Sequence, residues 1–265
     1  NYLNLPEDAN TMSKSIVRYS YLFLFLTVAS LAQAEELRAT EIFPIETYGC
    51  NYADGKGLDD LISVAKKWDK WADKNYSAPY DAWVLSPFYF NDQTQVDSIW
   101  VGTAKNFHQL GKTQDDWVSK GAAMQARFDS VSPCGNHALW GGRVVKEQSQ
   151  ITKDGLVAFQ MCKLGEDANA PDVAAADVKW AAYLESEGIS DGLHYWYPGS
   201  GVSSDREWDF LSVQISSNFA AWGSAIDTAV NGGGLMQFGA IYGNLMSCKN
   251  AGVWTYQQVR QTIAD

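Results

Sequence analysis

The chain has 265 residues, of which 46% are apolar and 19% are charged. That share of apolar residues is enough to build a buried core, so the composition excludes an intrinsically disordered protein. With 20 Lys and Arg against 31 Asp and Glu, the formal net charge is −11. Nucleic acids and anionic membrane surfaces are bound by basic faces. We therefore expect neither of them as a partner.

The N-terminal segment has the pattern of a secretory signal peptide. Lys14 and Arg18 precede an apolar stretch from Tyr21 to Leu31, and Ala32-Gln33-Ala34 follows as a cleavage site. This stretch is shorter than the roughly 20 residues that cross a bilayer. We predict that residues 1–34, which are upstream residues plus a signal peptide, are removed near Ala34. The mature protein is then periplasmic or secreted, without membrane insertion; an amphipathic N-terminal helix is the alternative.

Four cysteines follow the predicted cleavage site: Cys50, Cys134, Cys162 and Cys248. An even number of cysteines in an oxidising compartment is typical of two disulfides. Buried free thiols and a metal site are the alternatives. No C-x-x-C pair is present and the histidines do not have ligand spacing. We therefore predict no metal site.

An internal duplication divides the chain into two repeats, residues 40–150 and 151–265. An offset of 112 residues relates Cys50 to Cys162. Many other residues match in order at offsets of 112 to 114, and such a series is not expected by chance. The matched pairs include Lys67-Trp68 with Lys179-Trp180, Trp83 with Trp196, Asn106-Phe107 with Asn218-Phe219, Cys134 with Cys248, and Trp140 with Trp254.

Apolar spacing predicts the same six elements in both repeats, in the order β-α-β-β-α-β. In the first repeat they are a strand over 42–50, a helix over 58–71, strands over 82–90 and 96–105, a helix from an N-cap at Thr113 to Arg127, and a strand over 137–145. In the second repeat the corresponding ranges are 156–162, 171–184, 193–197, 208–216, 224–235 and 252–259.

This order is that of the split β-α-β, or ferredoxin-like, plait. Right-handed crossovers place its four strands in the order 4-1-3-2. The first strand then lies antiparallel beside the fourth, and Cys50 and Cys134 lie at the same end of this pair. The topology therefore predicts one disulfide in each plait, Cys50–Cys134 and Cys162–Cys248.

A duplicated chain of this kind resembles the tandem members of the dimeric α/β-barrel superfamily. The resemblance implies an α+β fold in which two ferredoxin-like plaits pack as one pseudo-dimeric barrel, with the helices outside. The superfamily includes cofactor-free monooxygenases that act on polycyclic phenols, haem-degrading enzymes, haem-binding chlorite dismutases, dye peroxidases and stress-responsive proteins. The resemblance rests on element order and duplication, so it implies the fold more strongly than the function.

Each of the three histidines, His108, His137 and His194, occurs in one repeat only. An imidazole can act as an acid, a base or a haem ligand. We take His108 and His194 as candidate catalytic bases of a monooxygenase-like enzyme. None of the three lies in a predicted helix, where the haem peroxidases carry their proximal histidine, and the motif of the haem-degrading enzymes is not recognised. We therefore predict no cofactor, with haem as the alternative.

Eleven Trp are unusual in a chain of this size. The duplicated ones are expected to fill the barrel and the seam between the helices and the sheet, whereas unpaired ones would suit a flat apolar cleft for an aromatic ligand. The predicted ligand-binding residues are Asn106, Trp100, Trp117, Trp208, Trp222 and Asn218. Binding of a small apolar or aromatic molecule is thus the first hypothesis. A cofactor-independent monooxygenase-like enzyme and a structural or interaction module are the alternatives, and the oligomeric state stays open.

Overall fold

A computed structural model describes residues 41–92 and 94–263 of the chain. The predicted signal peptide lies outside these residues. Within the described ranges, no helix is both long enough and apolar enough to cross a membrane.

The two repeats contain the same elements in the same order. The first half consists of β1 (Phe43–Cys50), α2 (Leu58–Asn75), β2 (Asp81–Tyr89), β3 (Ser98–Thr103), α3 (Phe107–Lys120), α4 (Ala122–Asp129) and β4 (Cys134–Lys146). The second half consists of β5 (Asp154–Leu164), α5 (Ala170–Ser186), β6 (Gly192–Pro198), β7 (Phe210–Ser216), α6 (Phe219–Val230), α7 (Gly234–Tyr242) and β8 (Met246–Arg260).

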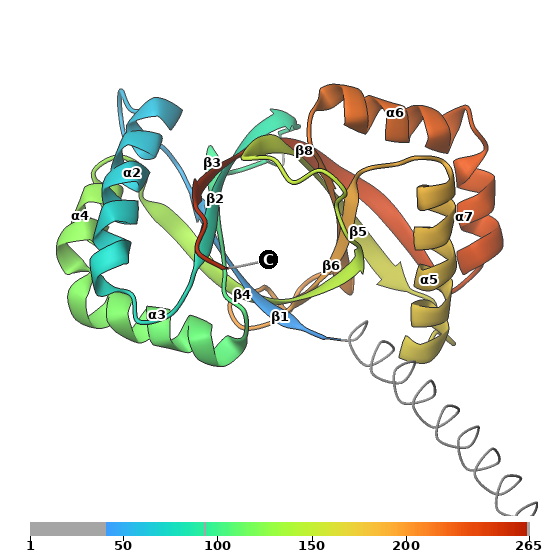
Figure 1. The fold of residues 1–265 in the computed structure, drawn as a ribbon, viewed down its shortest axis with the longest axis horizontal. Coiled ribbons are helices and arrows are strands. Elements are labelled where there is room, and N and C mark those ends of the chain that lie inside the picture. The colour runs from blue at the N-terminus through green and yellow to red at the C-terminus, as the bar shows by residue number, and fades with distance from the viewer. Residues whose placement is uncertain (1–40, 93, 264–265) are drawn as a thin grey trace, which may run out of the picture. The chain divides into compact units, whose positions relative to one another are not determined.

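The eight strands form one closed antiparallel barrel in the order β1-β3-β2-β8-β5-β7-β6-β4. Each half therefore has the predicted strand order 4-1-3-2. The barrel closes because β2 pairs with β8 and β4 pairs with β6. Figure 1 shows α2, α3 and α4 on one side of the barrel and α5, α6 and α7 on the opposite side. This is the predicted pair of ferredoxin-like plaits.

The barrel interior is filled by side chains from all eight strands. Its buried cluster consists of Ile45, Leu85, Val101, Ala138, Trp140, Val157, Phe159, Trp196, Val213, Trp254 and Tyr256, with Trp83 partly buried against it. The duplicated Trp140 and Trp254 therefore fill the core, as predicted. A second duplicated pair, Trp68 and Trp180, packs between the helices and the outer face of the sheet, in the predicted seam.

The strand register corrects one matched pair. Trp83 lies opposite Val101 of β3, and the residue opposite the equivalent Val213 of β7 is His194. His194 is therefore the counterpart of Trp83, while Trp196 lies two residues further along β6. The match at an offset of 113 joined two interior positions of the barrel that are not equivalent.

The second helix of each repeat begins earlier than predicted. The side chain of Asn106 accepts a hydrogen bond from the Gln109 backbone N–H at 2.9 Å and caps α3. Thr113, the predicted cap, is buried within the helix and donates its hydroxyl to the Leu110 carbonyl. Asn218 caps α6 in the same way. Both predicted helices are also divided in two, at Gly121 and at residues 231–233.

Both predicted disulfides are present. Cys50 is bonded to Cys134 and Cys162 to Cys248, and in each pair the two residues face each other across neighbouring strands. Each bridge joins the first strand of a plait to its fourth strand. Two such bridges are typical of proteins that fold in an oxidising compartment.

Candidate functional site

Each half has a cavity between the outer face of its sheet and its helices, but the two cavities differ greatly in volume. The first-half cavity has a volume of about 70 Å³ and the second-half cavity about 890 Å³. Sites for small-molecule ligands have volumes of about 300–1,000 Å³. Only the second-half cavity reaches this range.

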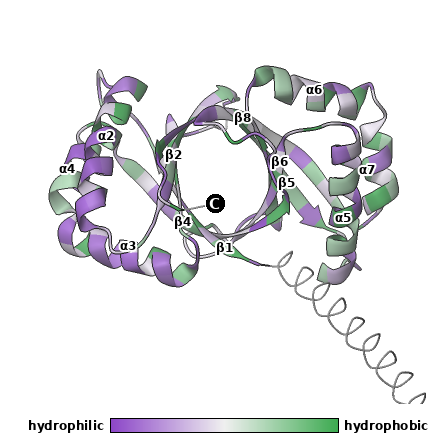
Figure 2. Cartoon of the chain, viewed as in Figure 1, coloured by the Kyte–Doolittle hydropathy of each residue, from purple (hydrophilic) through white to green (hydrophobic). Residues whose placement is uncertain are grey.

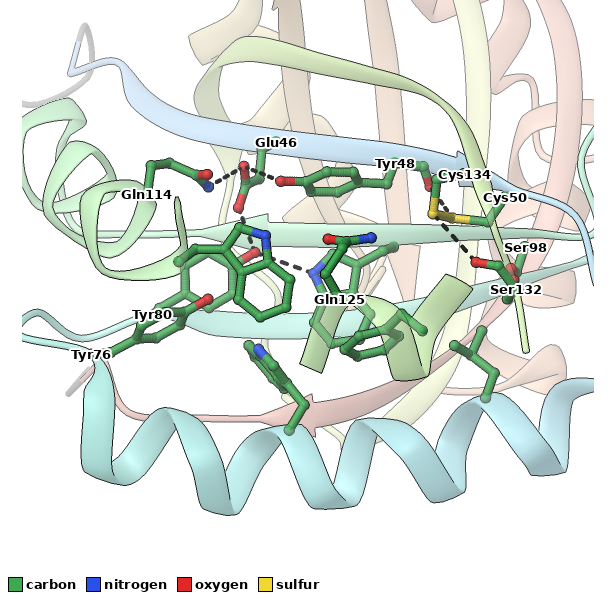
Figure 3. Close-up of a pocket in the computed structure, with 15 residues that line it drawn as sticks. Glu46, Tyr48, Cys50, Tyr76, Tyr80, Ser98, Gln114, Gln125, Ser132 and Cys134 are labelled. Atoms are coloured by element: carbon green, nitrogen blue, oxygen red, sulfur yellow. Dashed lines mark hydrogen bonds between the residues drawn. A yellow bond between two sulfur atoms is a disulfide. The ribbon is translucent and has the colours of Figure 1, made fainter. Parts of the chain in front are cut away.

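A buried carboxylate, Glu46 of β1, lies in the lining of the first-half cavity. Its Oε1 accepts the hydroxyl of Tyr80 at 2.6 Å, and its Oε2 accepts the side-chain amide of Gln114 at 2.6 Å. The hydroxyl of Tyr48 donates to Oε2 at 3.4 Å. In Figure 3, Gln114 and Tyr48 reach the carboxylate from opposite sides. These donors compensate for the burial of the charge.

His137 completes the cluster around Glu46. Its Nε2 lies 2.9 Å from Oε2 of Glu46, and its ring stacks on Tyr48 with 3.8 Å between the ring centroids. The imidazole side chain is 47% exposed, whereas that of Glu46 is 3% exposed. A carboxylate that orients an accessible imidazole is an arrangement suited to proton transfer. This pair is not evident from the sequence, because the contact depends on the register of β1 against β4.

The tyrosines around Glu46 stay protonated donors. Burial, together with the neighbouring carboxylate of Glu46, raises the pKa of Tyr80 well above its usual value. Burial also raises the pKa of Tyr48. The indole N–H of Trp100 donates to the Tyr80 hydroxyl at 3.2 Å. The first-half cavity is therefore occupied by a hydrogen-bonded network of its own side chains.

In the second half, small or aliphatic residues occupy the positions of this network. Strand register and the Asn caps of α3 and α6 define the equivalent positions. Ala158, Ser212, Ile226 and Ala229 replace Glu46, Trp100, Gln114 and Trp117, and all eight side chains line their own cavity. Loss of this side-chain volume explains why the second-half cavity is so much larger.

Aromatic rings form much of the wall of the second-half cavity. They come from α5, α6, α7, the last residue of β2 and the residue after it: Trp180, Tyr183, Trp222, Phe238, Tyr89 and Phe90. The ring of Tyr89 lies 5.7 Å from that of Trp222, and Phe88 lies 4.4 Å from Phe219. The first half thus contributes part of the wall of the second-half cavity.

One carboxylate, Asp191, lies in the lining of the second-half cavity and is 3% exposed. Its Oδ2 accepts hydrogen bonds from Gln214 Nε2 and Ser216 Oγ, both at 2.6 Å. Its Oδ1 is buried and has no hydrogen-bond partner among the described residues. The buried Lys146 ammonium bonds to the main-chain oxygen of Asp191 at 3.0 Å, not to its carboxylate.

Two of the helices that cover the second-half cavity, α6 and α7, are almost uncharged. Between Phe210 and Met246, Asp227 is the one charged residue. The side chains of Val230, Leu235 and Met236 are 61–79% exposed on this surface. The equivalent helices of the first half carry Lys112, Asp115, Asp116, Lys120, Arg127 and Asp129. Figure 2 shows this contrast, with α3 mostly purple and α7 mostly green.

A second buried carboxylate in this half, Asp177 of α5, has all its partners within the protein. Its Oδ1 accepts the hydroxyls of Tyr195 at 2.9 Å and Tyr242 at 2.8 Å. Its Oδ2 is ion-paired with Arg143 of β4. Burial is the main cause that raises the pKa of Tyr195. This network attaches α5 and α7 to the sheet.

The predicted ligand-binding residues do not lie together in one site. Trp100 and Trp117 line the first-half cavity, and Trp222 lines the second-half cavity. Trp208 packs against the barrel core, parallel to Trp140 with 6.1 Å between the rings. The two remaining residues, Asn106 and Asn218, are helix caps.

The two candidate bases lie outside both cavities. His108 is exposed and is the second residue of α3, which corrects the expectation that no histidine lies in a helix. His194 contacts Phe43 and belongs to the interior face of the barrel. Burial lowers the pKa of His194 to about 4. At neutral pH His194 is an uncharged and weak base.

A His-ligated haem does not fit the second-half cavity. The proximal ligand of peroxidase-type haem is histidine. None of the three histidines, all of which are described, lines this cavity. Its aromatic walls suit a flat ligand, but the chain offers no such iron ligand there.

Comparison with solved structures shows the fold. No protein-family model and no curated protein matches the sequence. A protein from Fusobacterium nucleatum assigned as a monooxygenase has a TM-score of 0.52 and 6% identity, covering 83% of this chain and 92% of its own. A mutant chlorite dismutase from Candidatus Nitrospira defluvii has a TM-score of 0.50 and 12% identity, covering 83% of this chain and 94% of its own. The chain therefore has the dimeric α/β-barrel fold in tandem form.

Proposed function

We propose that this tandem α/β-barrel protein binds a small, largely apolar ligand in its second-half cavity. One observation carries the proposal: four positions filled by Glu46, Trp100, Gln114 and Trp117 in the first half hold smaller or aliphatic residues in the second. Protein interiors are close-packed, and voids larger than a water molecule are few. A space of about 890 Å³ lined by Trp, Tyr and Phe is therefore best explained as a binding site.

The surface around the second-half cavity supports an apolar ligand. A ligand that approaches over α6 and α7 meets exposed side chains such as Val230, Leu235 and Met236, and a single charge at Asp227. Exposed apolar patches on soluble proteins commonly mark binding sites. The acidic surface elsewhere on the chain favours solubility without adding a charge at this cavity.

Binding of a fluorescent probe tests the proposal. N-phenyl-1-naphthylamine, a neutral aromatic dye that fluoresces in apolar surroundings, should bind saturably with one molecule per chain. Ala229→Trp restores the indole that Trp117 supplies in the first half, and it should weaken binding at least tenfold. Ala182→Trp is the matched control, because Ala182 is exposed on α5 and does not line the cavity. Equal binding by Ala229→Trp and the wild type would contradict the proposal.

We also propose that the mature protein is exported from the cytoplasm. The two disulfides and the pattern of residues 12–34 both support a periplasmic or secreted protein. Intact mass of the protein recovered from the periplasm or medium tests this. We expect a chain that begins after Ala34 and lacks four hydrogens. A chain that still carries residues 1–34 would contradict it.

Proton transfer at the Glu46–His137 pair is the second candidate function. The observation that favours it is an accessible imidazole held by a buried carboxylate at 2.9 Å. The oxygenase hypothesis placed the base at His108 or His194, whereas this geometry favours His137. Turnover of phenolic substrates by His137→Gln, His108→Gln and His194→Gln would separate the three. Loss of activity in His137→Gln alone is the result expected for a Glu46–His137 enzyme.

A further inference from the structure

We infer that the ligand of the second-half cavity carries a hydrogen-bond-donating headgroup, an amine or a hydroxyl, which Asp191 accepts. This inference rests on the proposed binding function and specifies the class of ligand. It follows from the unused acceptor on Asp191, from the charges along the cavity wall and from the comparison of the two halves.

The carboxylate of Asp191 has an unused acceptor. Both of its donors, Gln214 and Ser216, bond to Oδ2, and Oδ1 has no partner among the described residues. A buried polar atom without a hydrogen bond is costly and rare in native proteins. Asp191 is 3% exposed and lines the cavity. Because Oδ1 itself has less than 1 Å² of accessible surface, a donor on the ligand would satisfy this atom after a small rotation of the carboxylate toward the cavity.

The charges on the cavity wall exclude an anionic headgroup. Among the described lining residues, Asp191 is the one charged side chain, and the wall holds no Lys, Arg or His. The nearby ammonium of Lys146 is buried and bonds to the main-chain oxygens of Glu147 and Asp191. A ligand carboxylate would therefore be desolvated beside a like charge, with no cation lining the cavity to pair with it.

The first half shows how the equivalent position is satisfied internally. Asp191 and Tyr80 occupy equivalent positions in the two halves. Asp191 lies two residues before the β6 residue that pairs with Gln214, and Tyr80 lies two residues before the β2 residue that pairs with Gly102, the counterpart of Gln214. In the first half the Tyr80 hydroxyl donates to Glu46. In the second half an acceptor, Asp191, replaces the donor, and Ala158 replaces Glu46. An internal donor for Oδ1 of Asp191 is missing, and a donor from the ligand would take its place.

The aromatic side chains of the cavity wall would contact the rest of the ligand. Trp180, Trp222 and Tyr183 offer flat apolar faces for an aromatic body. The same rings attract a cationic amine through cation–π contacts. An aromatic amine or an aromatic alcohol therefore matches both parts of the cavity.

A matched headgroup series tests the inference on the wild-type protein. Bound N-phenyl-1-naphthylamine is displaced by 2-naphthylmethylamine, 2-naphthylmethanol, 2-methylnaphthalene and 2-naphthoic acid. We expect the amine and the alcohol to bind at least tenfold more tightly than the hydrocarbon, and the acid to bind most weakly. If the dye binds but the headgroups make no difference, or the acid binds best, the inference is overturned while the binding function stands. If the dye does not bind, both proposals fail.

Substitution at Asp191 supplies the second test. Asp191→Asn should retain binding of the dye, which reports an intact cavity, and should reduce the preference for the amine at least tenfold. Asp227→Asn is the matched control, because it removes the same charge from the same half at an exposed position outside the cavity lining. An unchanged preference in Asp191→Asn, or an equal loss in Asp227→Asn, would overturn the role of Asp191.

Discussion

His194 of β6 lies at the barrel position that Trp83 fills in β2. Both residues pair with a valine on the adjacent strand, Val213 and Val101 respectively, and both point into the apolar interior. An indole can be buried there at little electrostatic cost, but a protonated imidazole cannot. Burial accordingly lowers the pKa of His194 to about 4.

The low pKa of His194 makes stability depend on pH. Between pH 6.5 and pH 4 the unfolded chain binds a proton at this residue and the folded chain does not, so stability falls as the pH falls. Relative to His194→Leu, the wild type should lose about 2 kcal/mol of unfolding free energy between pH 7 and pH 5. Urea unfolding of both proteins across this range measures the difference.

The control for the His194 experiment is the exposed His108. His108→Leu should show the same pH dependence of unfolding as the wild type, because the imidazole of His108 is not buried. A constant stability difference between the wild type and His194→Leu from pH 7 to pH 5 would show that His194 is hydrated in the folded protein.

Removing the charge of Asp177 should be strongly destabilising. Asp177→Asn leaves the buried guanidinium of Arg143 without its partner and weakens the bonds from Tyr195 and Tyr242. Loss of one member of a buried ion pair costs about 3–5 kcal/mol. Chemical denaturation measures this cost. The exposed pair Lys56–Asp60 is the control, and Asp60→Asn should cost less than about 1 kcal/mol.

Each disulfide should contribute substantially to stability. The residues joined by Cys50–Cys134 are 84 apart in sequence, and those joined by Cys162–Cys248 are 86 apart. Closing a loop of this length stabilises a fold by about 4 kcal/mol in the chain-entropy account. The double substitutions Cys50→Ala/Cys134→Ala and Cys162→Ala/Cys248→Ala should lower the unfolding free energy by comparable amounts. A loss of less than about 1 kcal/mol in either variant would contradict this account.

The stability of the protein should depend on the hydrogen bond that the Tyr80 hydroxyl donates to Glu46. Tyr80→Phe removes the donor to Oε1 of Glu46 and the acceptor of the Trp100 indole N–H. An unsatisfied buried polar group costs about 1–3 kcal/mol, so the unfolding free energy should fall by that amount. Thermal or urea unfolding checks this. An unchanged stability would mean that water replaces the hydroxyl.

The sequence predicts most of the fold because two signals agree. Apolar spacing gives the element order, and the offset near 112 residues shows that the order is repeated. Strand order and disulfide pairing then follow from the handedness of crossovers. The predicted starts of the second helices are wrong: the helices begin at the duplicated Asn106-Phe107 and Asn218-Phe219, because Asn is a preferred N-cap.

The functional residues were harder to predict because they depend on register and volume. Glu46 and His137 are 91 residues apart in sequence and meet only through the pairing of β1 with β4. The large cavity depends on the difference between Trp117 and Ala229 and on three similar differences. The signal for this cavity in the sequence is therefore the difference in side-chain size between equivalent positions of the two repeats.

A crystal structure of the protein with 2-naphthylmethylamine would locate the ligand and its headgroup. We expect the naphthalene ring between the walls formed by Trp180 and Trp222, with the amine nitrogen within hydrogen-bond distance of Asp191 Oδ1. A ligand bound elsewhere on the surface, or in the second-half cavity with its amine directed to solvent, would overturn the proposed binding of an amine headgroup by Asp191.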